Sequence, residues 1–248
     1  MNVLSLFSGI GGLELGLERA GMTVVGQVEI DEFCRRVLAK HWPEVPRHDD
    51  VRTCVEWWRA EPQPAVDLIC GGFPCQPFSH AGHRLGVADD RWGWPWMADV
   101  IRVVRPRYIV VENVAALLRD SDAFGWLLAD LADIGMDAEW GVLSACAVGA
   151  PHTRERLFLV AYADGRDGSP WLGAVKTGSR QIPTRHRRAR AWRDQVAEAV
   201  EASRSDDREV DGSARRLVAM GGHAVVPQVA EHVGRLILAA DAERGAAA

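Results

Sequence analysis

The chain has 248 residues, of which 48% are hydrophobic and 25% charged, a balance typical of a globular protein with a hydrophobic core. No apolar run approaches the roughly twenty residues that a membrane-spanning helix needs, and the first residues lack the basic start of a secretion signal. The net charge of −5 means that any nucleic-acid-binding surface must be local, and five cysteines without a CxxC pair suggest neither a zinc site nor a disulfide framework. We therefore expect a cytoplasmic protein with no metal site.

Strand and helix signals alternate through the first two-thirds of the chain. Apolar, β-branched runs predict strands at residues 3–7, 23–28, 66–70, 108–111 and 157–161. A helix follows the glycine loop and runs to about Ala20, and further helices are predicted at 31–40 and 122–133. Asp31 is the expected N-cap of the second helix. This alternation predicts an α/β fold built on an open, doubly wound, mostly parallel sheet with helices on both sides.

The composition changes near residue 164, where glycine, serine, proline and arginine replace the apolar periodicity. Helical periodicity returns at 225–240 and suits a helix packed on the sheet. We therefore predict one large domain at 1–163, a small irregular region at 164–221, and a C-terminal segment at 222–248 that returns to the large domain.

Glycine-rich or acidic segments directly follow the first two predicted strands, at the edge of a parallel sheet where ligands bind. The loop Phe7-Ser8-Gly9-Ile10-Gly11-Gly12 would bring backbone amides and a helix N-terminus to a ligand. Glu14 replaces the third glycine of a dinucleotide fingerprint, so a structural turn is an equally good interpretation. Glu29 suits ribose hydroxyls and Ile30 an adenine face, although a solvated glutamate before a helix would give the same pattern.

A cysteine follows the third apolar strand, in Gly71-Gly72-Phe73-Pro74-Cys75-Gln76-Pro77-Phe78-Ser79. Glycine allows close packing there and two prolines stiffen the chain, so the thiol is held in place as a nucleophile needs to be. A lone cysteine is more often inert packing. The nucleophile is favoured because the next strand ends in Glu112-Asn113-Val114.

Three more segments belong to the same ordered set: Asp50-Val51, Arg105-Pro106 and Arg154-Glu155-Arg156. With them the chain closely resembles the DNA cytosine-5 methyltransferase family, particularly its short prokaryotic or phage-like members. The resemblance covers residues 1–163 and returns at 222–237. It implies the class I S-adenosylmethionine-dependent methyltransferase fold, S-adenosylmethionine as cofactor, and methyl transfer to C5 of a cytosine in double-stranded DNA.

The resemblance also implies the catalytic residues, which are Cys75, Glu112, Arg154 and Arg156. The Cys75 thiolate would add to cytosine C6, and Glu112, holding a proton, would bind N3 and the exocyclic amine. Arg154 and Arg156 would share one face of a strand and favour the thiolate. A surface ion pair of these arginines with Glu155 or another acid is the alternative.

Cofactor and DNA contacts follow from the same resemblance. The implied cofactor-binding residues are Phe7, Ser8, Gly9, Gly11, Gly12, Glu29, Ile30, Asp50, Val51 and Pro74. Asp50 would accept from the adenine amine, with the adjacent Asp49 able to exchange roles, and Val51 would pack on the ring. The implied DNA-binding residues are Gln76, Ser79, Arg185, Arg187, Arg188 and Arg190, the four arginines belonging to a cluster that could equally be a solvated face.

Because C5 and C6 are hidden in a duplex, the target cytosine must be flipped out. The segment 80–96 would close over it, and its three tryptophans, Trp92, Trp94 and Trp96, suit either base stacking or plain core packing. The chain departs from the family pattern at His152 and His223, where glutamine and asparagine are usual, and at Ser5, where aspartate is common.

Two other functions fit the same motifs. One is an RNA cytosine-5 methyltransferase, favoured by the short recognition segment, and the other is a lapsed module that binds cofactor or DNA without turnover. Cys75 and Glu112 argue against the second, because a pure binder needs neither. The family resemblance suggests a restriction endonuclease as companion, and nothing in the sequence demands more than a monomer.

Overall fold

The computed structural model describes residues 1–60, 63–74, 92–150, 152–163 and 224–247. Its seven-stranded sheet has the order β3-β2-β1-β4-β5-β7-β6. The strands are β1 (Asn2–Leu6), β2 (Thr23–Val28), β3 (Arg47–His48), β4 (Leu68–Gly71), β5 (Tyr108–Val114), β6 (Met136–Ser144) and β7 (Glu155–Ala163). The α-helices are α1 (Gly12–Ala20), α2 (Glu32–His41), α3 (Cys54–Ala60), α4 (Trp94–Val104), α5 (Ser121–Asp133) and α9 (Pro227–Ala247). Short 3₁₀ turns are η1 (Val51–Thr53), η4 (Ala115–Arg119) and η5 (Ala145–Val148).

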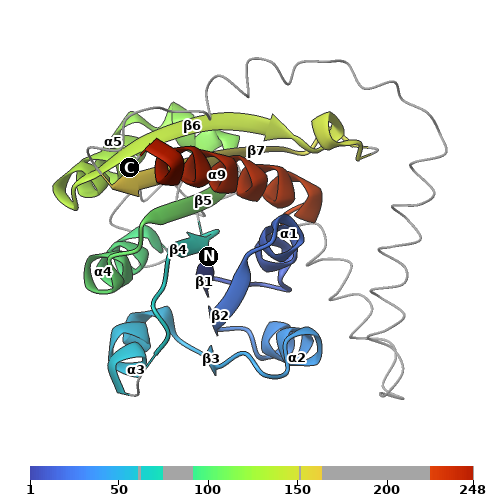
Figure 1. The fold of residues 1–248 in the computed structure, drawn as a ribbon, viewed down its shortest axis with the longest axis vertical. Coiled ribbons are helices and arrows are strands. Elements are labelled where there is room, and N and C mark those ends of the chain that lie inside the picture. Colours follow the sequence, from blue (N-terminus) through green and yellow to red (C-terminus); the bar gives the residue numbers. More distant parts are fainter. Residues whose placement is uncertain (61–62, 75–91, 151, 164–223, 248) are drawn as a thin grey trace.

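The predicted mostly parallel sheet is confirmed, with one strand reversed. β7 pairs antiparallel with both β5 and β6, and the other strand pairs are parallel. The chain leaves β1 on one side towards β2 and returns on the other side at β4 (Figure 1). The carboxyl ends of β1 and β4 therefore flank the point where the strand order reverses, which is where such sheets bind ligands.

Helices cover both faces of the sheet, because alternate residues of its buried strands point to opposite sides. On one face, Val3, Leu68 and Val110 pack in the cluster that includes apolar residues of α1 and α9. On the other, Leu4 and Ile69 belong to the cluster formed with α4 and α5. Figure 1 shows α9 lying across the sheet beside α1.

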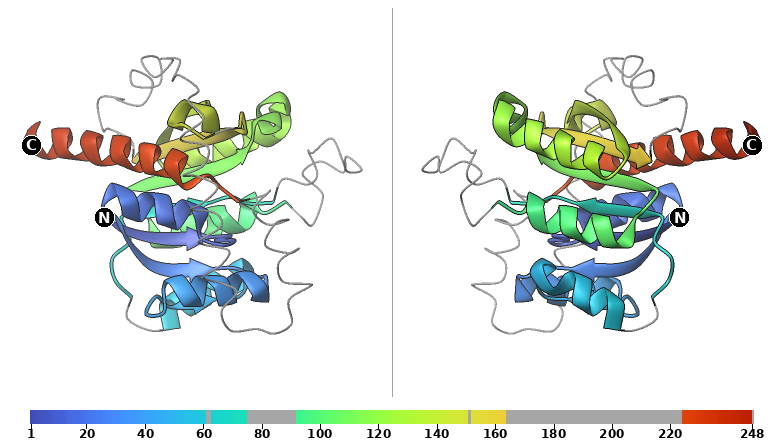
Figure 2. Two further views of the ribbon diagram at one scale, coloured as in Figure 1. Left: turned by 90° about the vertical axis from the view of Figure 1, so that its right-hand side faces the viewer. Right: turned by 90° about the vertical axis from the view of Figure 1, so that its left-hand side faces the viewer.

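The last helix is longer than the sequence predicted. It begins at Pro227, a residue suited to the first helical turn, and continues to Ala247. In Figure 2 its final turns project beyond the rest of the described ribbon. None of the helices within the described ranges is long and apolar enough to cross a membrane.

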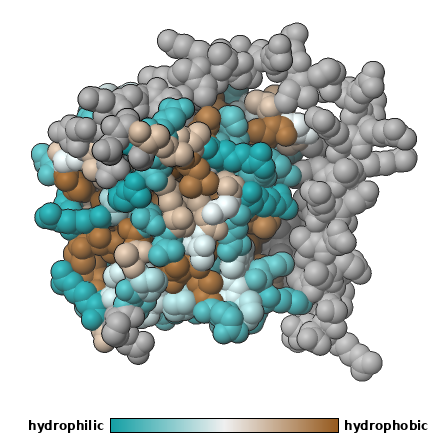
Figure 3. Space-filling view, in the orientation of Figure 1, coloured by the Kyte–Doolittle hydropathy of each residue, from teal (hydrophilic) through white to brown (hydrophobic). Residues whose placement is uncertain are grey.

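Besides the two-residue β3 and the 3₁₀ turns, three elements were absent from the sequence-based prediction. The strand β6 at the sheet edge leaves Trp140 and Val142 exposed, so it lacks a clear apolar alternation. The helix α4 starts inside the segment that we expected to be a mobile cover, and the short α3 has only Cys54 fully buried. On the face seen in Figure 3, apolar side chains appear in patches separated by hydrophilic ones.

Candidate active site and cofactor pocket

The glycine loop after β1 is held in an unusual backbone conformation. Phe7, with φ 54°, and Gly9, with φ 55°, both lie in the left-handed region, which a phenylalanine rarely adopts. The Ser8 N–H donates to the Val28 carbonyl at 3.1 Å, so the loop is tied to the end of β2. Strain of this kind is retained where the surrounding structure holds it, and such positions cluster at binding sites.

Two further glycines of this loop are explained by packing. A β-carbon on Gly11, whose φ is 90°, would stand 2.4 Å from the Trp42 ring. One on Gly12 would stand 2.5 Å from the Val225 carbonyl oxygen, in the segment before α9. Close packing alone therefore explains why glycine is needed at these two positions. Beneath the loop, the buried Ser8 hydroxyl donates to the Ser5 hydroxyl at 3.0 Å, where the family commonly has aspartate.

Glu29 follows β2, and its carboxylate is hydrogen-bonded to the glycine loop. Its Oε2 accepts the Gly9 N–H at 2.6 Å, and its Oε1 accepts the Asp31 N–H at 2.8 Å. It is therefore not merely a solvated glutamate before a helix. Asp31 caps α2 as predicted, by accepting the Cys34 N–H at 3.0 Å.

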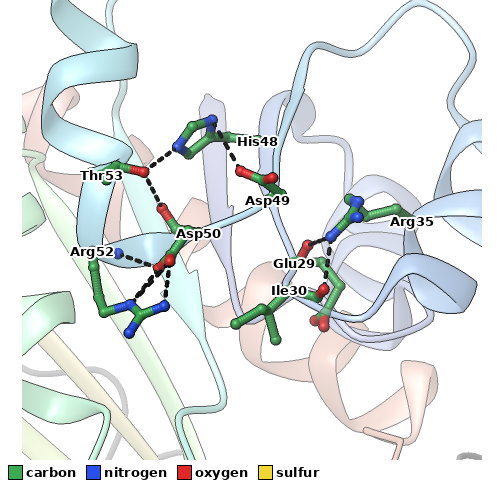
Figure 4. A network of polar contacts seen from close by, with 8 residues as sticks. All are labelled: Glu29, Ile30, Arg35, His48, Asp49, Asp50, Arg52 and Thr53. Atoms are coloured by element: carbon green, nitrogen blue, oxygen red, sulfur yellow. Dashed lines mark hydrogen bonds and ion pairs between the residues drawn. The ribbon is translucent and has the colours of Figure 1, made fainter.

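Ile30 is presented to solvent by a well-held backbone. Its side chain is 68% exposed, the most exposed large hydrophobic residue among those described. Arg35 on α2 donates from Nη1 to the carbonyls of Glu29 at 2.9 Å and Ile30 at 2.7 Å (Figure 4). An apolar side chain fixed in an exposed position beside a carboxylate suits the flat face of an adenine.

Asp50 stands at the next strand end, just before η1. Its carboxylate accepts from the backbone and guanidinium of Arg52, which lowers the pKa of Asp50 (Figure 4). Val51 is buried in the core beneath. Asp49 instead lies 3.8 Å from the His48 imidazole and is 68% exposed, so the two aspartates have different surroundings.

The residues on either side of positions 75–91 pack against one another. The buried Phe73 ring packs edge-on against Trp92 at 5.3 Å and tilted against Trp94 at 5.7 Å. A β-carbon on Gly93 would stand 3.0 Å from Pro74 and 3.1 Å from Phe7. The glycine loop, the exposed Pro74 and the start of α4 are therefore neighbours.

Trp92 and Trp94 belong to the hydrophobic core, 4% and 1% exposed, so core packing is the correct interpretation for both. The prediction that a cover extends to residue 96 is wrong at its end, because α4 begins at Trp94. Trp96 is half-buried. Cys75, Gln76, Ser79, His223 and the arginines Arg185, Arg187, Arg188 and Arg190 lie outside the described residues.

Glu112 lies inside β5 and not after it, because β5 extends to Val114 and pairs with β7 over that length. Glu112 is 7% exposed, and its Oε2 lies 3.0 Å from where a β-carbon on Gly72 would stand. Its neighbour Asn113 donates from Nδ2 to the Phe73 carbonyl at 3.1 Å. These contacts bring the end of β5 against the segment that leads into Cys75.

Two arginines surround the Glu112 carboxyl group. Arg156 Nε lies 3.1 Å from Glu112 Oε1, so Arg156 pairs with Glu112 and not with the side chain of Glu155. Burial raises the pKa of Glu112, although Arg156 and Arg154 oppose this. The contact between Arg156 and Glu112 Oε1 lacks the geometry of a hydrogen bond, so within the described residues this buried oxygen is ion-paired and keeps hydrogen-bonding capacity.

Arg154 is not in the strand that we expected it to share with Arg156, because β7 begins at Glu155. The Arg154 backbone is held instead by Ala145, whose N–H donates to its carbonyl at 3.0 Å, and by His152, whose Nδ1 accepts the Arg154 N–H at 3.4 Å. Burial, with some help from Arg154, lowers the pKa of His152. Arg154 and Arg156 line a small pocket together with the apolar residues Val225 and Val226.

The structure adds two residues that the sequence did not single out, Arg35 and Arg52. Each is an arginine that fixes a residue predicted to bind cofactor. Arg52 could have been noticed, since it stands two positions after an acidic residue at a strand end. Arg35 reaches Glu29 across a helical turn, and nothing in the sequence marks it.

A family profile described as C-5 cytosine-specific DNA methylase matches residues 1–215. The chain belongs to this family. Its sheet order and its structural neighbours give it the fold of the class I S-adenosylmethionine-dependent methyltransferases.

Two relatives show how far the likeness extends. The chain is 35% identical over 176 residues to the Type II methyltransferase M2.BsuMI of Bacillus subtilis, a match that covers 67% of this chain and 44% of that protein. It is 38% identical over 177 residues to the Type II methyltransferase M.Eco47II of Escherichia coli, covering 66% and 41% respectively. The chain thus spans about half the length, or less, of these members of the C-5 cytosine methylase family.

Solved structures agree with the fold. The S. pombe Dnmt2 methyltransferase aligns over 96% of this chain and 98% of its own, with a TM-score of 0.65 and 18% identity. The Entamoeba histolytica methyltransferase EhMeth aligns over 68% and 55%, with a TM-score of 0.56 and 21% identity.

Proposed function

We propose that this chain transfers a methyl group from S-adenosylmethionine to C5 of a flipped-out cytosine in double-stranded DNA. The observation that carries the proposal is the buried carboxyl group of Glu112, with its pKa raised, set against Gly72 and beside two arginines. A raised pKa makes it easier for this carboxyl group than for an ordinary surface glutamate to hold a proton and give it to a ring nitrogen.

Cytosine C5 is a weak nucleophile, and the proposed residues overcome this together. The Cys75 thiolate forms a bond to C6 while Glu112 gives a proton to N3, so the ring becomes an enamine with electron density at C5. After C5 has gained the methyl group, a water-derived base takes the C5 proton, and the C5–H electron pair forms the C5–C6 double bond as the C6–S bond breaks and the thiolate leaves. N3 returns its proton to Glu112, which restores the aromatic ring. Arg154 and Arg156 supply positive charge near the reacting groups, which favours the thiolate and the contacts to the flipped nucleotide.

The residues around the strand ends fit S-adenosylmethionine, which when bound supplies an electrophilic methyl group. Ile30 offers an exposed apolar face, and Glu29 keeps acceptor capacity for ribose hydroxyls beyond its two backbone bonds. Asp50 offers a carboxylate to the adenine amine. Phe7 and Pro74 lie together at the switch point, beside Gly93.

DNA recognition is assigned to the segment after Cys75 and to residues 164–221. Gln76 and Ser79 would contact the flipped nucleotide and its neighbours, and Arg185, Arg187, Arg188 and Arg190 would contact phosphates and guanine edges. The three-part division at residues 164 and 222 belongs to this proposal, as does a Type II restriction endonuclease as companion, suggested by the relatives.

The proposal is tested by covalent trapping on duplex DNA that contains 5-fluorocytosine in varied sequence contexts. Fluorine at C5 prevents the final elimination, so the wild-type chain with S-adenosylmethionine should remain attached to the DNA. The Cys75→Ala variant should form no adduct, while Cys146→Ala, which removes an exposed cysteine, should trap normally.

The outcomes are read from denaturing gels. An adduct that depends on Cys75 and on cofactor supports the proposal, and its dependence on context begins to define the target sequence. Cofactor binding without any adduct to DNA contradicts it. An adduct to 5-fluorocytosine RNA alone would identify an RNA enzyme, and no adduct to either would identify a lapsed module.

A further inference from the structure

The Asp50 carboxylate is held on both oxygen atoms by a single neighbour, Arg52 (Figure 4). Its Oδ1 accepts the Arg52 backbone N–H and Nε–H, each at 2.9 Å. Its Oδ2 accepts the same Nε–H at 2.9 Å and an Nη2–H at 2.5 Å. The backbone N–H, the Nε–H and one Nη2–H thus share a carboxylate that has about four acceptor positions, so room remains for one further donor.

The same guanidinium also contacts α4. Its Cζ lies 5.8 Å from the centroid of the Trp96 ring, in the first turn of that helix, which is a cation–π distance. The Arg52 side chain is 55% exposed, so these two contacts, and not burial, fix its position. Arg52 therefore links Asp50 to the first turn of α4.

We propose that Arg52 is a positioning residue for the adenine of the cofactor, holding the Asp50 carboxylate in one orientation and leaving one acceptor position for the exocyclic amine. The inference rests on the proposed function, in which Asp50 binds that amine. A carboxylate that rotates freely loses side-chain entropy when it binds the amine. A carboxylate already held by a planar guanidinium has lost that entropy before binding, so the ligand binds more tightly. Lysine would keep the charge but could not hold both oxygens in this way.

The test pairs a change at Arg52 with a change at the amine. The wild-type chain, Arg52→Gln and Arg52→Lys are titrated by calorimetry with S-adenosylhomocysteine and with its analogue in which hydrogen replaces the adenine amine. Arg52→Gln should weaken the adenine ligand about fivefold and the analogue less than about twofold, as expected when the Asp50 side chain has to be ordered on binding. Arg52→Lys should fall between the wild type and Arg52→Gln for the adenine ligand.

Arg235→Gln is the matched control. Arg235 is similarly exposed, at 66%, and pairs with Glu231 at 2.6 Å on α9, so its removal should change neither affinity.

Three results would overturn the inference. Equal weakening of both ligands would give Arg52 a general structural role, and no change in either would give it none. Tighter binding of the adenine ligand alone would mean that Arg52 competes with the amine. If the folded wild-type chain bound neither ligand, the proposed cofactor function itself would be wrong, and this result differs from the other three.

Discussion

Glu112 and Glu14 are both removed from water, but their surroundings differ. Glu112 has Arg154 and Arg156 beside it, so its charged form remains within reach during a reaction. Glu14, in the first turn of α1, is fully buried near the hydroxyls of Ser5 and Ser8. These hydroxyls favour its charged form, yet neither makes a hydrogen bond of normal geometry to its carboxyl oxygens. Burial therefore dominates and raises the pKa of Glu14 to about 7.

This shift predicts that Glu14 makes the stability of the protein depend on pH. Because its pKa rises from 4.5 to about 7 on folding, the folded chain holds a proton that the unfolded chain releases between these values. The resulting stabilisation is complete below about pH 4.5 and is lost as the pH rises to about 7, amounting to about 3 kcal/mol. Glu14→Gln stays neutral and has no such loss.

Urea denaturation of the wild type and Glu14→Gln at pH 5 and pH 8 measures the effect. The free energy of unfolding of the variant, relative to the wild type, should rise by about 2.5 kcal/mol between the two pH values, because part of the effect is already lost at pH 5. A difference that does not change with pH would show that Glu14 does not titrate in this range.

At the scale of elements, α1 packs tightly against α9. A β-carbon on Gly16 would stand 2.4 Å from both the Ala230 β-carbon and the Pro227 carbonyl oxygen. Gly16→Ala should therefore force the helices apart and lower the free energy of unfolding by about 1–3 kcal/mol, despite the better helix propensity of alanine.

Gly125→Ala gives the matched comparison, because Gly125 lies inside α5 and a β-carbon there meets nothing within 4 Å. The same substitution should raise stability there by up to about 1 kcal/mol. Chemical denaturation of both variants checks the opposite signs, and stabilisation by Gly16→Ala would mean that the helices separate without cost.

The sequence predicted those elements whose apolar pattern is set by burial on both sides, such as the strands that became β1, β4 and β5. It missed α4, whose start with Pro95 among tryptophans resembles a loop, and β6, whose exposed Trp140 obscures the alternation. It predicted the edge where the site residues meet, because parallel strands bring their carboxyl ends together.

Finer placement depended on contacts that no local pattern records. Glu112 lies within β5 because β7 pairs with that strand as far as Val114. Arg154 lies outside β7 because its carbonyl is bound by Ala145, at the other end of the β6–β7 connection. Arg52 could be named in advance as a neighbour of Asp50, but not as a contact of Trp96.

At the scale of the whole molecule, α9 is fastened to the centre of the sheet by Asp241. Its Oδ1 accepts the Tyr108 hydroxyl at 2.9 Å and also pairs with Arg107, while Arg244 donates to the same hydroxyl. Asp241→Ala should lower the free energy of unfolding by about 2 kcal/mol, because the buried Tyr108 hydroxyl loses its acceptor and Arg107 is left with its ion pair to Asp67 at 3.7 Å.

Asp99→Ala is the control for this prediction. Asp99 is 66% exposed and pairs with Arg102 at 3.0 Å, so its removal should change stability by less than about 0.5 kcal/mol. Chemical denaturation of the two variants decides the matter, and equal effects would show that the Asp241 cluster contributes no more than a surface ion pair.

The packing of α9 against the glycine loop has a consequence for protein synthesis. Gly12 lies against Val225, and Gly16 against Pro227 and Ala230, so the loop nearest the amino terminus is completed by residues translated more than two hundred positions later. A nascent chain that has not yet released α9 from the ribosome therefore has an unsupported loop after β1. The loop after β1 therefore gains these packing partners only once α9 has left the ribosome and docked on α1.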